Sequence, residues 1–358
     1  MDVELFNFEL PEARIALRPA SPRDSSRLLQ VKGRVLTDHI ARDLADLLRP
    51  GDILVLNETK VLRASLSGVR PARAHGGGGD VKIGFNLHKQ ISGNTWRAFA
   101  RPAKRLKQGD IVRFSGELTA QIIDKQTGGD VGLLFNMSGE ALGHAIEQIG
   151  EMPLPPYIAR QRKVDVRDND DYQTVFAVDK GSVAAPTAGL HFTPALFAKL
   201  ESSGVKIARL TLHVGAGTFL PMSCEDTDDH LMHSEWYSID EKTAAQINAA
   251  KKAGGRVIAV GTTALRALES CANDAGNGEW AVVPGSADTD IFITPGYGFK
   301  IIDGLLTNFH LPKSTLFMLV SAFCGLDNMQ AAYKYAIDNN YRFYSYGDTS
   351  LLWKHQNV

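Results

Sequence analysis

The chain has 358 residues, 44% of them hydrophobic, and a formal net charge of −1. This length predicts two or three domains, and the apolar segments spread along it exclude a disordered protein. The longest strongly apolar stretch, residues 316–323, is too short for a membrane span, and the acidic N-terminus is unlike a signal peptide, so we expect a soluble cytoplasmic protein.

Residues 61–155 have the pattern of a small antiparallel β-barrel. Short segments of alternating polarity are separated there by turns rich in Gly and Asp. Strands are expected at residues 81–85, 96–99 and 111–114. The proline-rich residues 152–156 are expected to lead the chain out of this insert.

The flanking segments alternate between strands and helices, which predicts an α/β domain. Helix starts are marked by N-capping residues, and one helix ends before a glycine. Helices are expected after Thr193, from Asp240 to Lys252, from Thr262, from Ser314 to Phe323 and from Met329 to Asp338, with strands at residues 205–214 and 256–260. We therefore predict a discontinuous α/β domain, residues 1–60 and 156–358, that carries a β-barrel domain at residues 61–155.

The net charge hides an uneven distribution. Residues 61–163 contain 15 basic and 8 acidic residues, whereas residues 164–358 contain 15 and 22. A basic segment in a neutral chain indicates contact with a polyanion, although a solvated face explains the charge equally well. In the barrel the candidates are Arg97, Arg101, Lys104, Arg105, Lys107 and Arg113, with Asp110 as their acidic neighbour. The second choice is the N-terminal group Arg14, Arg18, Arg23 and Arg27.

Two loops carry residues suited to binding and proton transfer. One precedes a helix, where free backbone N–H groups bind anions and where His191 can exchange a proton near pH 7. A histidine that satisfies loop carbonyls is the structural alternative. The other loop follows a strand with a Gly-x-Gly pattern that permits close approach of a nucleotide, but a tight turn is the simpler explanation. The residues concerned are Thr187, His191, His213, Gly215 and Gly217.

Two further groups stand at helix starts. Arg266 and Glu269, in the helix that Thr262 opens, lie three residues apart on one face. They either pair with each other or hold the carboxylate and ammonium of a ligand. A later polar group is the densest candidate site of the chain. Its members are Asn308, His310, Lys313 and Ser314.

The sequence does not predict a metal site. His230, His233 and Glu235 lie close together but lack the HExxH pattern of a catalytic zinc site. The three cysteines are far apart and form no CxxC pair. We therefore expect no bound metal.

Several long strings occur in order along nearly the whole chain. They include residues 6–11 (FNFELP), 54–59 (LVLNET), 152–158 (MPLPPYI), 184–193 (AAPTAGLHFT), 305–313 (LLTNFHLPK) and 341–348 (YRFYSYGD). Together these strings resemble the S-adenosylmethionine:tRNA ribosyltransferase-isomerase family of queuosine synthesis. Ala264, Ala267 and Arg63 depart from the family pattern, whereas Arg266 and Glu269 are retained.

The resemblance implies a fold, an activity and substrates. The fold is an α/β domain with an inserted β-barrel. The activity is transfer and isomerisation of the ribosyl part of S-adenosylmethionine onto 7-aminomethyl-7-deazaguanine at the wobble position of tRNA, which yields epoxyqueuosine and releases adenine and methionine. No metal or redox cofactor is needed, because the sulfonium supplies the activation. The alternatives are an S-adenosylmethionine-dependent RNA methyltransferase and a non-catalytic RNA-binding protein.

The resemblance also suggests roles for the candidate residues. We expect His191 or His310 to move a proton, with Glu269 or Asp303 as the next choice, and Arg266 with Glu269 to bind the methionine part. The other polar loop residues are expected to bind the donor or the base, and the basic residues to hold the anticodon arm. Aromatic residues are expected to stack on the displaced base. These are Tyr172, Phe192 and Tyr297. We expect a monomer.

Overall fold

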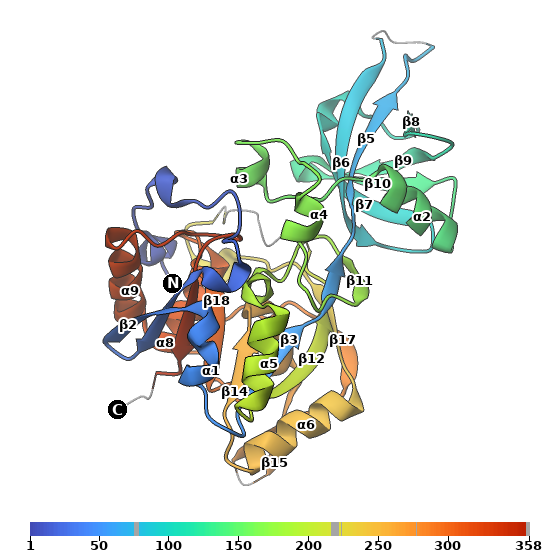
Figure 1. Ribbon diagram of the computed structural model, residues 1–358. Coiled ribbons are helices and arrows are strands. Elements are labelled where there is room, and N and C mark those ends of the chain that lie inside the picture. The colour runs from blue at the N-terminus through green and yellow to red at the C-terminus, as the bar shows by residue number, and fades with distance from the viewer. Residues whose placement is uncertain (75–78, 216–221, 223, 277, 356–358) are drawn as a thin grey trace. The chain divides into compact units, whose positions relative to one another are not determined.

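The computed structural model in Figure 1 describes residues 1–74, 79–215, 222, 224–276 and 278–355. The chain divides into two compact units. The first holds Met1–Lys60, Asp170–Asp179 and Ala185–Val358, and the second holds Val61–Asn169 and Lys180–Ala184. The second unit begins where the insert was expected and continues beyond residue 155. The predicted fold class, an α/β domain with an inserted β-barrel, is confirmed.

Within the described residues, a nine-stranded mixed sheet is the framework of the first unit. In spatial order its strands are β17 (Gly285–Thr289), β13 (Glu235–Ile239), β12 (Lys206–Leu212), β3 (Ile53–Asn57), β14 (Val257–Val260), β18 (Gly304–Asn308), β19 (Thr349–Trp353), β1 (Arg27–Lys32) and β2 (Val35–Ile40). β12, β3, β14 and β18 are parallel neighbours. β19 runs antiparallel to β18 and parallel to β1, so it joins the β1–β2 hairpin to the rest of the sheet.

The central strands are apolar along their whole length because both faces of the sheet are covered. Every residue of β3, β14 and β18 is buried. On one face, Leu54 and Leu56 join a core cluster with Leu44, Leu196 and Leu200 of the covering helices. These helices are α1 (Leu44–Leu47) and α5 (Pro194–Ser202). Other helices that contact the sheet are α6 (Glu241–Lys252), α7 (Thr262–Ser270) and α8 (Thr315–Cys324), with α9 (Leu326–Asp338) packed on α8.

Three predicted helix starts are confirmed by capping hydrogen bonds, whereas the helix expected from Met329 begins earlier, at Leu326. The Thr193 hydroxyl accepts from the Leu196 N–H at 3.2 Å, and the Asp240 carboxylate accepts from the Thr243 N–H at 2.6 Å. Ser314 caps α8 in the same way. These caps depend on short-range sequence, which is why the sequence alone could place them.

The second unit contains a closed barrel with strand order β10-β7-β6-β5-β8-β9. Its strands are β5 (Ser65–Arg70), β6 (Val81–Gln90), β7 (Thr95–Arg101), β8 (Ile111–Arg113), β9 (Thr119–Lys125) and β10 (Asp130–Phe135). Alternate residues of β6, such as Ile83, Phe85 and Leu87, are buried, as expected for a strand with one face toward an apolar interior. Helices α2 (Gly139–Ile149) and α3 (Pro156–Ala159) follow the barrel strands.

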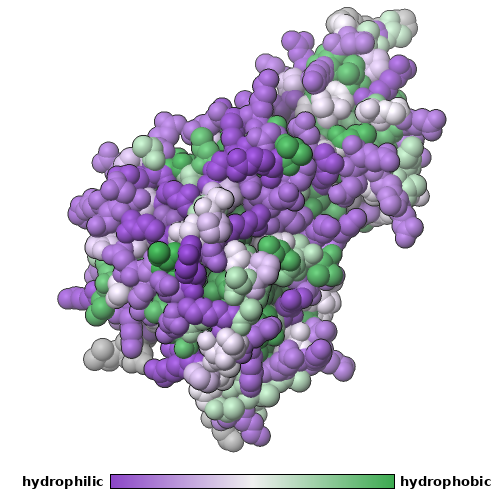
Figure 2. All heavy atoms as spheres, viewed as in Figure 1, coloured by the Kyte–Doolittle hydropathy of each residue, from purple (hydrophilic) through white to green (hydrophobic). Residues whose placement is uncertain are grey.

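The remaining elements are short. β15 (Ala272–Gly276) and β16 (Glu279–Val282) form a hairpin. The chain passes between the two units within or beside β4 (Thr59–Val61), α4 (Asp168–Asp171) and β11 (Asp179–Ser182). Hydrophilic residues cover most of the face shown in Figure 2. Among the described residues, no helix has both the length and the apolar character that crossing a membrane requires.

Candidate functional site

One edge of the large sheet collects most of the residues expected to carry chemistry. The parallel strands β12, β3, β14 and β18 all end at this edge, where β19 and β1 begin. The strand order reverses around β3, which has β12 on one side and β14 on the other. In open α/β sheets, ligands bind beyond the carboxyl ends of the strands at such a reversal. We call this edge, marked by Ser26, Asn57, His213, Thr262 and Asn308, the carboxyl edge.

Asn57, the last residue of β3, ties neighbouring strand ends together. Its amide oxygen accepts hydrogen bonds from the N–H groups of Thr59 at 3.2 Å and Leu212 at 3.0 Å. Its amide nitrogen donates to the Leu212 carbonyl at 2.9 Å and to the Thr263 hydroxyl at 3.3 Å. Asn57 therefore fixes the positions of β12, β3 and the start of α7 relative to one another. Asn57 was not among the predicted site residues.

His191 lies in a buried hydrogen-bonded cluster at the carboxyl edge. Its Nδ1 is 2.7 Å from the Ser26 hydroxyl, and its Nε2 is 3.2 Å from the Asn308 amide nitrogen. The Asn308 amide oxygen accepts from the Thr187 hydroxyl at 3.0 Å. Because an amide nitrogen only donates, Nε2 of His191 accepts, and the ring proton lies on Nδ1 toward Ser26. The structure thus brings together three predicted residues and adds Ser26.

Local folding explains this placement. Thr187 and His191 begin and end the short 3-10 helix η7 (Thr187–His191), and Asn308 is the last residue of β18. Ser26 immediately precedes β1, whose first residues pair with the start of β19. Three segments distant in sequence therefore meet in the cluster, because the sheet order places β18 and β1 on either side of β19.

Burial keeps the His191 ring neutral at pH 7. Desolvation lowers the pKa of His191 from 6.5 to about 4, and only 5% of the residue is exposed. The Asp348 carboxylate raises this pKa, whereas the cationic Arg342 and Arg23 lower it. Arg342 is itself held by Asp348, with its Nη2 2.9 Å from the carboxylate. A neutral ring with its proton on Nδ1 can accept a proton at Nε2 and has none there to give.

His310 does not join this cluster. Its Nε2 is 3.0 Å from the Thr307 hydroxyl, and its backbone N–H donates to the Tyr333 hydroxyl at 2.9 Å. Burial lowers the pKa of His310 to about 3. These contacts connect His310 to α9 rather than to His191, so the two predicted proton carriers occupy different environments.

The other members of the dense polar group also separate. The Ser314 hydroxyl donates to the Leu311 carbonyl at 2.7 Å and accepts from the Phe317 N–H at 3.1 Å. The second of these hydrogen bonds caps the N-terminus of α8. Lys313 has a positive φ of 53° and forms an ion pair with Glu4 near the N-terminus. The expectation that four polar residues form one dense site is therefore wrong, because the start of α8 uses Ser314 and the chain turns away at Lys313. Asn308 alone reaches the His191 cluster.

Arg266 and Glu269 do not pair with each other. Arg266 Nη1 forms an ion pair with Glu235, and its Nε donates to the Ile291 carbonyl at 3.3 Å. The Arg266 and Glu235 side chains are only 7% and 4% exposed. The other Glu235 oxygen accepts from the Gly215 N–H at 2.9 Å. Glu235 therefore connects α7 to the loop after β12, a role that its place beside His230 and His233 in the sequence did not suggest.

Arg266 also has a buried terminal nitrogen, Nη2, with no hydrogen-bond partner among the described residues. A buried guanidinium nitrogen without an acceptor is costly unless a ligand supplies one. Arg266 is therefore suited to bind a carboxylate. Gly217, the second glycine of the predicted Gly-x-Gly pattern, lies outside the described residues.

Glu269 holds a loop of its own chain. One carboxylate oxygen accepts from the Tyr297 hydroxyl at 3.2 Å and the Lys300 N–H at 2.9 Å. The other accepts from the N–H groups of Ile301 at 3.0 Å and Ile302 at 3.3 Å. A carboxylate offers about four acceptor positions, and all four are filled. This corrects the expectation that Glu269 faces a ligand ammonium or a moving proton.

His213 and Thr262 complete the carboxyl edge. His213 Nδ1 is 2.9 Å from the Thr59 hydroxyl, and its ring stacks on the Trp236 indole with centroids 5.0 Å apart. Burial lowers the pKa of His213. Thr262 begins α7 directly after Gly261, whose φ of 88° favours glycine and lets the chain turn from β14 into the helix.

Two of the three aromatic residues expected to stack on a base cannot do so. Tyr172 and Phe192 are completely buried, and they pack edge-on against Tyr346 and Phe176. The prediction was wrong for both because their sequence neighbourhood did not reveal that they belong to the core. Tyr297 is half-buried, and its hydroxyl is bonded to Glu269.

The basic residues of the barrel fall into two groups. Arg97 is bound by Asp124 at 2.5 Å and Asp130 at 3.1 Å, so the expectation that Asp110 is its acidic neighbour is wrong. Asp110 instead pairs with Arg73 at 2.6 Å. The other predicted residues are exposed and form no ion pair within the part of the chain that the structure describes. They are Arg101, Lys104, Arg105, Lys107 and Arg113.

The N-terminal arginines are mostly occupied by their own chain. Arg18 forms an ion pair with a carboxylate at 3.2 Å, and Arg23 donates to two backbone carbonyls. Arg27 pairs with a carboxylate at 2.9 Å while its guanidinium lies 3.7 Å from a tyrosine ring centroid. Arg14 is half-buried. These residues are therefore less free to meet a polyanion than the exposed barrel residues are.

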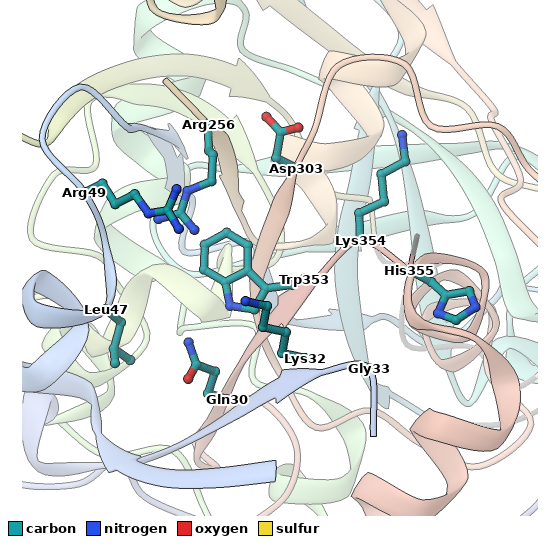
Figure 3. Close-up of a pocket in the computed structure, with 10 residues that line it drawn as sticks. All are labelled: Gln30, Lys32, Gly33, Leu47, Arg49, Arg256, Asp303, Trp353, Lys354 and His355. Atoms are coloured by element: carbon teal, nitrogen blue, oxygen red, sulfur yellow. The ribbon is translucent and has the colours of Figure 1, made fainter. Parts of the chain in front are cut away.

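A pocket lies at the opposite edge of the sheet. Figure 3 shows Trp353 in its centre with Arg49 and Arg256 to one side and Asp303 above. The Arg256 guanidinium lies 4.1 Å from the centroid of the Trp353 ring. Arg256 precedes β14 and Asp303 precedes β18, so this pocket faces away from the carboxyl edge. Of the residues predicted for the site, Asp303, a second choice for proton transfer, lines this pocket and so lies away from the His191 cluster.

The two buried histidines predict acid sensitivity of the fold. His191 and His310 have pKa values of about 4 and about 3, below the 6.5 of an exposed histidine. Below pH 6.5 the unfolded histidines bind protons that the folded ones do not, so the folded state loses stability as the pH falls. From pH 6.5 to pH 5 we expect a loss of about 1.5 kcal/mol for each histidine. Urea unfolding at both pH values measures it.

The matched control is the double variant His191→Asn, His310→Asn, which removes both titrating rings. Between pH 6.5 and pH 5, its free energy of unfolding should fall by about 3 kcal/mol less than that of the wild type. An unchanged pH dependence in this variant would contradict the assignment of the acid sensitivity to these two residues.

Comparisons with known proteins agree over nearly the whole chain. The model of a family described as "Queuosine biosynthesis protein" matches residues 3–352. The S-adenosylmethionine:tRNA ribosyltransferase-isomerase of Maricaulis maris is 61% identical over 98% of this chain and 99% of that protein. The enzyme of the same name from Rhodopseudomonas palustris strain BisB5 is 54% identical over 99% of both chains. A crystal structure of an S-adenosylmethionine tRNA ribosyltransferase from Thermotoga maritima aligns with a TM-score of 0.54 and 32% identity, covering 97% of this chain and 99% of that one.

Proposed function

The chain belongs to the S-adenosylmethionine:tRNA ribosyltransferase-isomerase family of queuosine biosynthesis, and from this premise we propose how its residues carry out the reaction. The enzyme transfers the ribosyl part of S-adenosylmethionine to 7-aminomethyl-7-deazaguanine at the wobble position of tRNA and isomerises it. Epoxyqueuosine forms, and adenine and methionine leave. The observation that carries this function is identity of 54% to 61% with named relatives over nearly full length.

The product analysis tests the function directly. The protein is incubated with S-adenosylmethionine and with tRNA that carries the deazaguanine, and the products are separated by mass spectrometry. We expect free adenine, methionine and epoxyqueuosine-tRNA. S-adenosylhomocysteine with a methylated nucleoside would instead show a methyltransferase, and an unchanged mixture with bound tRNA would show a binding protein. The same tRNA with guanine at the wobble position is the control.

His191 is the proton acceptor of the reaction. A sulfonium acidifies the carbon next to it, and the base that removes this proton must lie where bulk water is excluded. His191 is neutral and buried at the carboxyl edge. Its Nε2 accepts a hydrogen bond from the amide nitrogen of Asn308. When the donor displaces that amide contact, Nε2 faces the donor.

Arg266 binds the carboxylate of the methionine part. Its buried Nη2 lacks an acceptor among the described residues, and Glu235 holds the guanidinium in place. A carboxylate and a guanidinium form strong charge-assisted hydrogen bonds. Thr262 and the Gly215 backbone lie at the same edge and take part in holding the donor or the base.

The exposed basic residues of the barrel bind the anticodon arm. RNA backbone binding requires cations that are not already neutralised, and Arg101, Lys104 and Arg105 meet this requirement better than Arg97 does. Such contacts orient the RNA without reading its sequence. The enzyme acts as a monomer in this proposal, without metal or redox cofactor.

Removing the positive charges of Arg101, Lys104 and Arg105, which we call the barrel patch, should weaken tRNA binding. It should also make the binding less dependent on salt. Each lost phosphate contact reduces the slope of log affinity against log salt by about 0.7 to 0.9. The triple variant Arg101→Ala, Lys104→Ala, Arg105→Ala should therefore lose a slope of about 2 to 3, while its KM for S-adenosylmethionine stays unchanged. Titrations of tRNA binding at several salt concentrations measure the slope.

The matched control removes three exposed lysines of the first unit. The residues are Lys206, Lys242 and Lys252. This variant has the same change in net charge and should keep the wild-type slope. Equal slopes in both variants would rule out the barrel patch, and the N-terminal arginines would be tested next.

A further inference from the structure

Trp236 is an exposed tryptophan at the carboxyl edge. It is the second residue of β13, and its carbonyl accepts a hydrogen bond from the His213 N–H at 2.9 Å. Its neighbours Glu235 and Tyr237 point to the buried side of the sheet, whereas 40% of Trp236 is exposed. Tryptophan is normally well buried because of its large apolar area, so an exposed one beside a candidate site needs an explanation.

The His213 imidazole packs against one face of the Trp236 indole. The two rings stack with an interplanar angle of 26°, and the Thr59 hydroxyl fixes the imidazole through Nδ1. Burial lowers the pKa of His213, so its ring is uncharged at neutral pH. One face of the indole is thus occupied by a fixed neutral ring. Its exposed area falls on the opposite face and the edges.

A rigid aromatic surface of this kind suits a nucleobase. Bases stack on aromatic side chains through the π-face that every base has, and Trp offers the largest such face. Phosphate contacts would require cations instead, and the two rings carry none. Trp236 shares the carboxyl edge with the proposed donor site, because it lies at the start of β13 there and its ring stacks on His213 of the loop after β12.

We propose that Trp236, backed by His213, is the stacking platform for a nucleobase during the reaction. This inference rests on the proposed function, in which both substrates bring bases, the adenine of S-adenosylmethionine and the bases of the anticodon loop. The shared chemistry is a planar heteroaromatic ring. It takes the role that the sequence had assigned to Tyr172 and Phe192, which are buried in the core.

The test compares two replacements of Trp236. Trp236→Phe keeps an aromatic face, and Trp236→Leu keeps an apolar side chain of the strand without one. Loss of one base–aromatic stack corresponds to about a 5- to 150-fold weaker interaction. We expect Trp236→Leu to raise by this factor either the KM for S-adenosylmethionine or the dissociation constant of tRNA, and Trp236→Phe to recover most of the loss.

The constant that changes identifies the base. A raised KM for S-adenosylmethionine alone assigns the platform to adenine, and weakened tRNA binding alone assigns it to a base of the RNA. Leu231→Ala is the matched control, because Leu231 is 88% exposed in the same region and offers no ring. It should leave both constants unchanged.

The proposal is overturned if Trp236→Leu and Trp236→Phe are equally impaired, or if neither constant moves in a folded Trp236→Leu protein. Thermal unfolding of each variant establishes that it is folded. Failure of the proposed function has a different signature, because the wild-type protein would then release no adenine. Direct binding of S-adenosylmethionine and of tRNA still reports on Trp236 in that case.

Discussion

Replacing His191 with alanine should lower kcat by about a hundred- to ten-thousand-fold, the usual effect of removing a general acid or base. The reason is that its Nε2 is the proton acceptor assigned to the reaction, and Asn308 beside it cannot accept a proton. The KM for S-adenosylmethionine should change much less. Single-turnover release of adenine measures the chemical step, and circular dichroism checks the fold.

Two controls separate chemistry from packing. Ser26→Ala removes the hydroxyl that accepts the Nδ1 proton of His191 and should slow the reaction only moderately, because Nε2 remains. His310→Ala removes a histidine of similar burial that contacts Thr307 and α9 instead. If His310→Ala loses as much turnover as His191→Ala while remaining folded, His191 does not have the special role assigned to it.

Replacing Arg266 with methionine should weaken S-adenosylmethionine binding by an amount equivalent to about 2–5 kcal/mol. It should also lower the free energy of unfolding by about 3–5 kcal/mol, because Glu235 would remain buried without its partner. Isothermal titration calorimetry measures the first effect, and urea unfolding measures the second.

A double variant distinguishes these two effects. In Arg266→Met, Glu235→Gln the uncompensated carboxylate is removed, while the glutamine oxygen can still accept from the Gly215 N–H. Stability should largely recover, but donor binding should not. If donor affinity recovers together with stability, Arg266 has a structural role only, and the carboxylate of the donor is bound elsewhere.

The sequence predicted the parts of this site that depend on neighbours in the chain. The caps at Thr193, Asp240 and Ser314 follow from residue types within three or four positions of each helix start. The alternation of strands and helices predicted an α/β domain, in which His191 and Asn308 end segments at one edge. Their direct contact could not be predicted, because 117 positions separate them.

The errors came from partners that are distant in sequence. Their spacing predicted that Arg266 and Glu269 act as a pair, either with each other or on a ligand, but the guanidinium binds the carboxylate of Glu235, 31 positions away. Glu269 was then free to accept four hydrogen bonds from residues 297–302. An ion pair between side chains three residues apart on a helix contributes only a few tenths of a kcal/mol, so a buried partner from another element outweighs it.

The position of β19 has a consequence for how the protein is made. This strand follows all the others in the chain, yet it lies inside the sheet, between β18 and β1. Synthesis proceeds from the N-terminus. The edge of β1 that pairs with β19 therefore stays unpaired until residues 349–353 emerge from the ribosome. Ser26 precedes β1, and Asn308 ends β18, so the two sides of the His191 cluster are joined only at this late step. A nascent or prematurely terminated chain that lacks β19 would expose a strand edge open to aggregation and would have no assembled catalytic cluster.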